Sequence, residues 1–106
     1  METLEELEQY RLKVVAELER RVLRMSELDN QIENARLALD VAGRARTTLG
    51  ASTARNQIEA AHRARLRQAL RDLEEERVQA HSDVTRAEER LKEVDGRIAA
   101  IQSTSD

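Results

Sequence analysis

The chain has 106 residues, of which 37% are charged, and it contains no Pro, Cys, Trp or Phe and a single Tyr, Tyr10. This length fits one domain at most, residues 1–106. The lack of aromatic residues argues against an ordinary globular core, in which they supply much of the buried area. Without Cys, a disulfide scaffold and a thiolate metal site are both excluded. A charged, aliphatic and Ala-rich composition with helical periodicity is typical of a coiled coil.

The chain also shows no targeting or membrane signal. Its first residues are acidic and lack the apolar segment of a signal peptide. No stretch is long and apolar enough to span a bilayer. We therefore expect a cytoplasmic protein with no membrane insertion.

The first predicted helix covers about residues 3–48. Thr3 is a good N-cap, and Glu6 three residues later completes a capping box. Apolar residues then recur at steps of three and four, which is the seam spacing of a coiled coil. One seam position holds Leu4, Leu18, Met25, Ile32 and Leu39, and the other holds Leu7, Val14, Leu28, Ala35 and Ala42.

A turn is predicted at about residues 49–52, followed by a second helix over about 53–102. Gly50 is the expected left-handed residue that ends the first helix. Thr53 is the expected N-cap of the second helix, with Asn56 as a second candidate. Residues 103–106 should fray. The second seam holds Leu66, Leu70, Leu73, Ala80, Val84, Ala87, Leu91, Val94, Ile98 and Ile101.

These elements predict an all-α fold, an antiparallel two-helix coiled-coil hairpin. The alternative is one continuous helix in a parallel dimer. If the heptad register of the first seam is extended along the chain, it does not coincide with the seam positions of the second. The register must therefore shift in the segment that holds the glycines and the Ser/Thr run. The break, the turn residues and the nearly equal arms favour the hairpin.

Charge is unevenly distributed along the chain. Residues 1–40 carry a net charge of −4, residues 41–71 carry +6 and residues 72–106 carry −5. A hairpin would therefore place a basic tip opposite an acidic base. The arginines are either helix formers on a solvated face or the contact site for an acidic partner. This basic tip comprises Arg44, Arg46, Arg55, Arg63, Arg65, Arg67 and Arg71.

Two features of the helices depart from a simple two-helix seam. Arg11, Arg21 and Arg77 occupy seam positions and must extend to its edge. They either soften the seam locally or specify register or partner. The first helix also carries a second apolar stripe. It either reflects the chance placement of Leu and Val along a long helix or marks an interface. Such an interface could belong to a homodimer that forms a four-helix bundle or to a complex with a different protein. The stripe comprises Leu12, Val15, Val22, Leu23, Leu37 and Val41.

No catalytic or cofactor motif stands out, so we expect neither an enzyme nor a cofactor. Glu59 and His62 have the Glu-x-x-His spacing of di-iron bundles. Such a site needs a second motif of this kind, but Val78 rather than Glu stands three residues before His81. The segment from Arg55 to Arg67 is reminiscent of a leucine-zipper basic region. However, Glu59 and Ala64 depart from that pattern, so nucleic-acid binding is not the favoured prediction.

The whole chain resembles the small coiled-coil stalk proteins of flagellar and type III secretion export ATPases. The resemblance runs from Leu4-Glu-Glu-Leu7, which starts an Arg/Glu-rich helix, through a polar turn to the stretch from Arg65 to Leu91. Helical-hairpin substrates of type VII secretion match in length but carry a Trp-x-Gly turn that this chain lacks.

The stalk resemblance implies a non-enzymatic scaffold that contacts an ATPase ring through its open end. That end comprises Leu4, Leu7, Ile98 and Ile101. The alternatives are an oligomerisation or adaptor module, and a nucleic-acid or anionic-surface binder that uses the basic tip.

Overall fold

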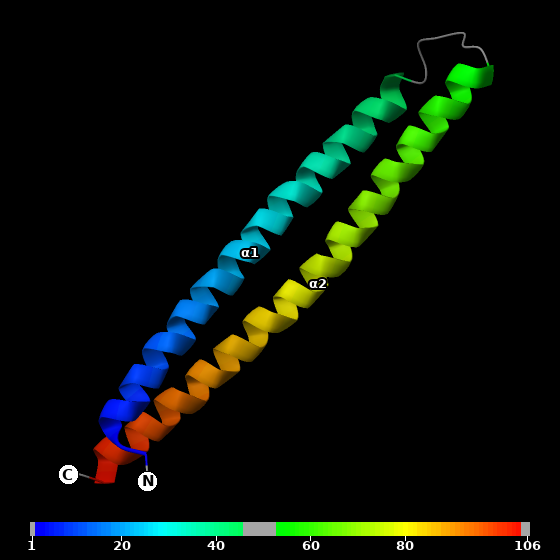
Figure 1. Cartoon of the computed structure of the whole chain (residues 1–106). Helices are drawn as coiled ribbons and strands as arrows, with labels where there is room; N and C mark the ends of the chain where they lie inside the picture. The colour runs from blue at the N-terminus through cyan, green and yellow to red at the C-terminus, as the bar shows by residue number, and fades with distance from the viewer. Residues whose placement is uncertain (1, 46–52, 105–106) are drawn as a thin grey trace. The chain divides into compact units, whose positions relative to one another are not determined.

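The computed structural model describes residues 2–45 and 53–104, which form two long α-helices (Figure 1). Helix α1 spans Leu4–Ala45 and helix α2 spans Thr53–Thr104. The predicted end of the first helix at about 48, the turn at 49–52 and Gly50 lie outside the described residues. Asn56 lies inside α2 and is therefore not its N-cap. At its other end α2 continues two residues past the predicted boundary.

The predicted cap of α1 is confirmed. The Glu6 amide donates a hydrogen bond of 3.2 Å to the Thr3 hydroxyl, and the Leu7 amide donates one of 3.1 Å to the Thr3 carbonyl. The Glu6 amide is one of the first-turn N–H groups that have no partner inside the helix, and the Leu7 amide makes the first i to i−4 bond of the helix. Glu5 and Glu6 add negative charge at the same end, where the helix dipole favours it.

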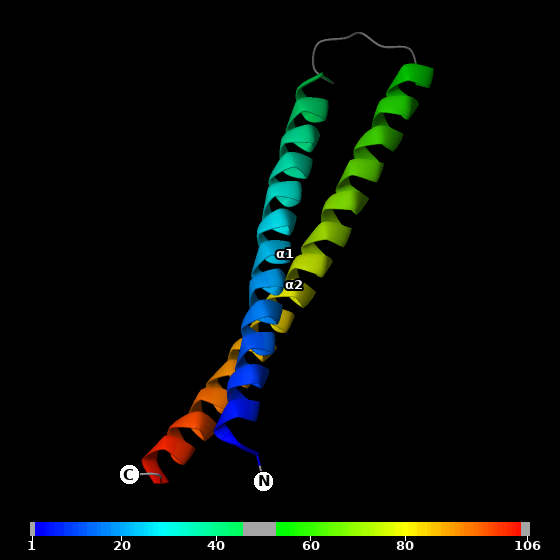
Figure 2. The ribbon, with the colours of Figure 1, turned by 60° about the vertical axis from the view of Figure 1, so that its left-hand side comes forward.

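The pairing of the helices falls into two compact units. Unit 1 comprises Met1–Met25 with Gln79–Asp106, and unit 2 comprises Ser26–Val78. In unit 1, the start of α1 lies beside the end of α2 in both views (Figures 1 and 2). Its helices run antiparallel, because ion pairs join Arg11 to Asp95 and Arg21 to Asp83.

Unit 2 has the same antiparallel order. Asp29 pairs with Arg77, and Arg36 pairs with Glu74, so a later residue of α1 again meets an earlier residue of α2. The prediction of an all-α antiparallel two-helix hairpin is confirmed. The alternative of one continuous helix is wrong.

The core is a narrow aliphatic seam. All twenty predicted seam residues are buried or half-buried, so the periodicity identified the packing face of both helices. Leu28 is the largest side chain that is fully buried, at 1% exposure. The buried residues of unit 1 are Leu7, Val14, Ala80, Val84, Ala87 and Val94, and those of unit 2 are Leu28 and Ile32.

This seam predicts a sharp difference between two leucines of α1. Leu28→Ala should lower the free energy of unfolding by about 2–5 kcal/mol, because it removes buried methyl groups and leaves a cavity. Leu23→Ala makes the same replacement at a side chain that is 63% exposed. It should change the free energy by less than about 0.5 kcal/mol. Urea unfolding followed by circular dichroism measures both, and equal losses would contradict the assigned seam.

Candidate interaction surfaces

The three seam arginines reach across to aspartates of the opposite helix. Arg11 Nε lies 2.6 Å from Asp95 Oδ1, and Arg77 Nε lies 2.8 Å from Asp29 Oδ1. The hydrogen bond that Arg11 donates to Asp95, together with the negative charge of Asp95, raises the pKa of Arg11 above its ordinary value.

Arg21 completes the set, at 3.5 Å from Asp83. The side chains of Arg11, Arg21 and Arg77 are 43%, 47% and 32% exposed. The prediction that they extend to the edge of the seam is therefore confirmed. Because each has an acidic partner on the other helix, the arrangement supports the interpretation that they specify register.

The open end in unit 1 offers less apolar surface than predicted. Leu7 is only 3% exposed, so it belongs to the seam. Leu4, Ile98 and Ile101 are half-buried. Contact with a partner at this end would therefore use the edges of these side chains.

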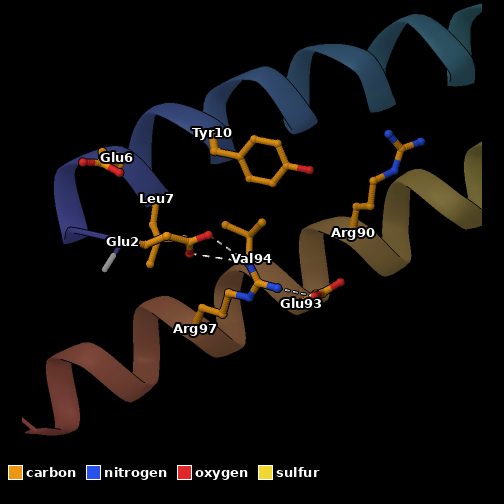
Figure 3. Close-up of a pocket in the computed structure, with 8 residues that line it drawn as sticks. All are labelled: Glu2, Glu6, Leu7, Tyr10, Arg90, Glu93, Val94 and Arg97. Carbon is orange, nitrogen blue, oxygen red and sulfur yellow. Dashed lines mark hydrogen bonds and ion pairs between the residues drawn. The ribbon is translucent and has the colours of Figure 1, made fainter.

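A hollow of about 440 Å³ lies between α1 and α2 near this end (Figure 3). Leu7 and Val94 supply apolar lining, and Tyr10, 43% exposed, extends over the space. Arg97 donates a hydrogen bond of 3.3 Å to Glu2, which precedes α1, and one of 2.7 Å to Glu93. The remaining lining residues are Glu6 and Arg90.

Sequence reasoning missed this hollow. The periodicity identified Leu7 and Val94 as seam residues, but it gave no sign that the ring of Tyr10 would cover the space beside them. The one signal was that Tyr10 is the sole aromatic residue of the chain.

The second apolar stripe is largely exposed, as an interaction surface requires. Val15 is the exception, since it is half-buried. Helix α2 also exposes two apolar residues, Ile58 at 68% and Val78 at 72%. The exposed members of the stripe are Leu12 at 62%, Val22 at 47%, Leu23 at 63%, Leu37 at 54% and Val41 at 63%.

The basic tip lies in unit 2 and does not form one face. Arg63, Arg67 and Arg71 succeed one another at four-residue steps and so share a side of α2. Arg65 falls on a different side, because two residues turn a helix by about 200°. Arg46 lies outside the described residues.

Intrahelical contacts hold several of the tip arginines. Arg44 pairs with Asp40 at 2.8 Å, and Arg55 pairs with Glu59 at 3.5 Å. Arg71 donates a hydrogen bond of 2.8 Å to Gln68. Acidic and amide neighbours therefore already offset part of the tip's charge.

A second hollow, of about 200 Å³, lies between α1 and α2 in unit 2. Ala42, Ile58, Glu59, His62 and Arg63 line it. Arg63 Nη1 is buried there without a hydrogen-bond partner. Over the described residues, no three His, Cys, Asp or Glu side chains come together in a group that could hold a metal ion.

Comparison with protein families, curated proteins and solved structures found no match for this chain. The resemblance to export-ATPase stalk proteins therefore extends only to the shared architecture of two antiparallel helices. Within residues 2–45 and 53–104, neither helix contains a stretch apolar enough to cross a membrane.

The cross-helix arginines predict a measurable coupling. Asp29→Arg should lower the free energy of unfolding by about 1 kcal/mol, because it places two arginines together. Arg77→Asp added to that variant should recover most of the loss by restoring the pair in reverse. Thermal unfolding of the singles and the double measures the coupling. The matched control is the Arg36–Glu74 pair, which is longer at 3.9 Å and should couple more weakly. A double variant as unstable as the sum of the singles would contradict this role.

Proposed function

We propose that this chain is a non-enzymatic protein-interaction module whose helix α1 docks other chains. The observation that carries the proposal is the exposure of large apolar side chains on the side of α1 turned away from α2. In unit 1 these are Leu12 and Leu23, and in unit 2 they are Leu37 and Val41. Large apolar side chains that gather on one side of a helix and stay exposed suit contact with another chain.

Helical geometry places these residues away from the seam. With about 3.6 residues per turn, Leu12 and Leu23 lie on nearly the same side of α1, three turns apart. Val14 is two residues from Leu12, which is about 200° around the helix, and Val14 is buried against α2. The hairpin partner therefore cannot cover Leu12, and another chain is needed to do so.

Ion pairs hold most of the charged groups of the end hollow. Arg97 is held by Glu2 and Glu93, and Arg90 is held by Glu17 at 3.3 Å. Four of the five charged lining residues, Glu2, Arg90, Glu93 and Arg97, are therefore held in contacts with other side chains.

The more specific proposal is a stalk or escort of a flagellar or type III secretion export ATPase. It rests on the architecture that the chain shares with that family. The ring would contact the open end of unit 1, where Leu4, Ile98 and Ile101 remain partly exposed.

The docking role predicts that two substitutions on α1 remove bound partners. Leu12→Glu with Leu23→Glu should lower partner recovery at least about tenfold, because each places a charge in an apolar contact. Affinity purification with quantitative mass spectrometry measures recovery. Thr85→Glu with Ser103→Glu is the matched control, since it adds the same charge at exposed polar positions of α2 in unit 1, away from the α1 face. Equal recovery from both variants would refute the docking role of this face.

The stalk role has its own measurement. A purified export ATPase from the same cell should bind the chain in titration calorimetry, and Ile98→Glu with Ile101→Glu should abolish that heat. Absence of binding by the wild type would remove the stalk proposal and leave the docking role standing.

The basic tip supports one alternative function, the binding of nucleic acid or an anionic surface. The row of Arg63, Arg67 and Arg71 is the feature that favours it. We expect no duplex binding at physiological salt, because three side chains on one side of a helix neutralise few phosphates. Fluorescence anisotropy with duplex DNA, across salt concentrations, tests this for the wild type and for a variant with Gln at 63, 65, 67 and 71. Tight binding whose salt slope falls by about 0.7–0.9 for each phosphate that the variant no longer neutralises would establish the alternative.

A further inference from the structure

The outer face of α1 in unit 2 carries a short row of residues whose charge changes sign from one end to the other. Glu33, Leu37, Asp40 and Arg44 follow at steps of four, three and four, which keeps them on one side of the helix. Val41 lies beside the middle of the row. Leu37 and Val41 are 54% and 63% exposed, and the side chain of Arg44 is 79% exposed.

We propose that this face binds the same face of a second copy of the chain, antiparallel, about a two-fold axis between Leu37 and Val41. The inference rests on the proposed docking role of α1 and names the occupant of its unit 2 face. In a two-fold interface each contact occurs twice with the partners exchanged. Leu37 of one copy then packs on Val41 of the other, and the reverse pair completes the apolar centre.

Charge complementarity selects this arrangement. Reversing the row places Glu33 of one copy beside Arg44 of the other, at both ends of the apolar centre. Two arginine–glutamate pairs therefore flank the contact. Asp40, nearest the axis, is already paired with Arg44 of its own chain at 2.8 Å. A parallel arrangement would instead place Glu33 against Glu33 and Arg44 against Arg44, which like-charge repulsion disfavours.

The corresponding face of unit 1 lacks this complementarity. Leu12 and Leu23 share their side of α1 with Glu5, Glu8 and Glu19. Arg20, three residues before Leu23, adjoins this side, whereas Arg11, Lys13, Arg21 and Arg24 fall on other sides of the helix. Self-pairing there would bring glutamates together, so the two-fold contact belongs to unit 2.

Sedimentation equilibrium of the full chain tests the contact directly. The wild type should be dimeric at micromolar concentration, and Leu37→Glu should raise the dimer dissociation constant by at least about 100-fold, since it enters the apolar centre twice. Val78→Glu makes a similar change at a 72% exposed residue of α2, outside the contact, and should leave the dissociation constant within about threefold. Circular dichroism checks that both variants keep their helicity. A monomeric wild type, or a dimer unaffected by Leu37→Glu, would overturn the proposal.

The charge pairs give a second and independent readout. Glu33→Arg and Arg44→Glu should each weaken the dimer about tenfold, and the double variant should return to within about threefold of the wild type. Glu19→Arg, a reversal at an exposed position of unit 1, serves as the control. A double variant weaker than either single would overturn the proposed pairing.

Cross-linking determines the direction of the helices, and the native chain has no cysteine to interfere. A mixture of Leu37→Cys and Val41→Cys chains should form the mixed disulfide, whereas each variant alone should cross-link poorly. Efficient cross-linking of Leu37→Cys to itself would show a parallel dimer and overturn the proposal. Partner capture through Leu12 and Leu23 without any dimer would refute this inference and leave the docking role intact.

Discussion

Two helices can cover only one stripe of each other, and the other features of this chain follow from that limit. The covered stripe is aliphatic and in places small, as Ala80 and Ala87 show. A seam of this width buries few side chains per turn, so long helices are needed to accumulate enough contact. It also leaves most of each helix facing outward, where charged and apolar residues must find water or another chain.

Arginines at the edge of the seam act mainly on specificity. Arg11, Arg21 and Arg77 would be costly inside the stripe, but at its edge each meets an aspartate of the other helix. Exposed ion pairs of this kind contribute little net stability. Their effect is larger on misaligned states, because a shift of register along the seam would take each arginine away from its aspartate. In a seam of interchangeable Leu, Val and Ala, such pairs are a means of choosing one alignment.

The periodicity of the sequence predicted nearly everything that depends on which face of a helix is covered. All twenty seam positions were correct, from Leu4 to Ile101, because a step of three and four leaves one choice of face. The sequence did not predict how far individual side chains extend or which residues they contact across the seam. The hollow beneath Tyr10 and the aspartate partner of each arginine depend on rotamers and on the alignment of two helices, which one sequence pattern does not determine. Val15 was assigned to the outer stripe, yet it lies close enough to the seam to be half-covered. Boundaries between faces are gradual, whereas the pattern assigns each residue to one side or the other.

The two helices divide the outward surface unequally. Helix α1 exposes Leu12, Leu23, Leu37 and Val41, whereas the large apolar residues exposed on α2 are Ile58 and Val78. A chain that needed only to remain folded would gain nothing from leucines on the solvated side of one helix, since their exposure favours aggregation. The asymmetry supports the proposal that α1 is the docking helix in both units. Apolar area alone does not distinguish a second copy from a different protein, but the charges beside it do. Acidic neighbours at Leu12 and Leu23 disfavour self-pairing and suit a basic partner, while the row from Glu33 to Arg44 complements itself. The two proposed contacts would therefore let one helix join two copies through unit 2 and leave the face in unit 1 for a different chain.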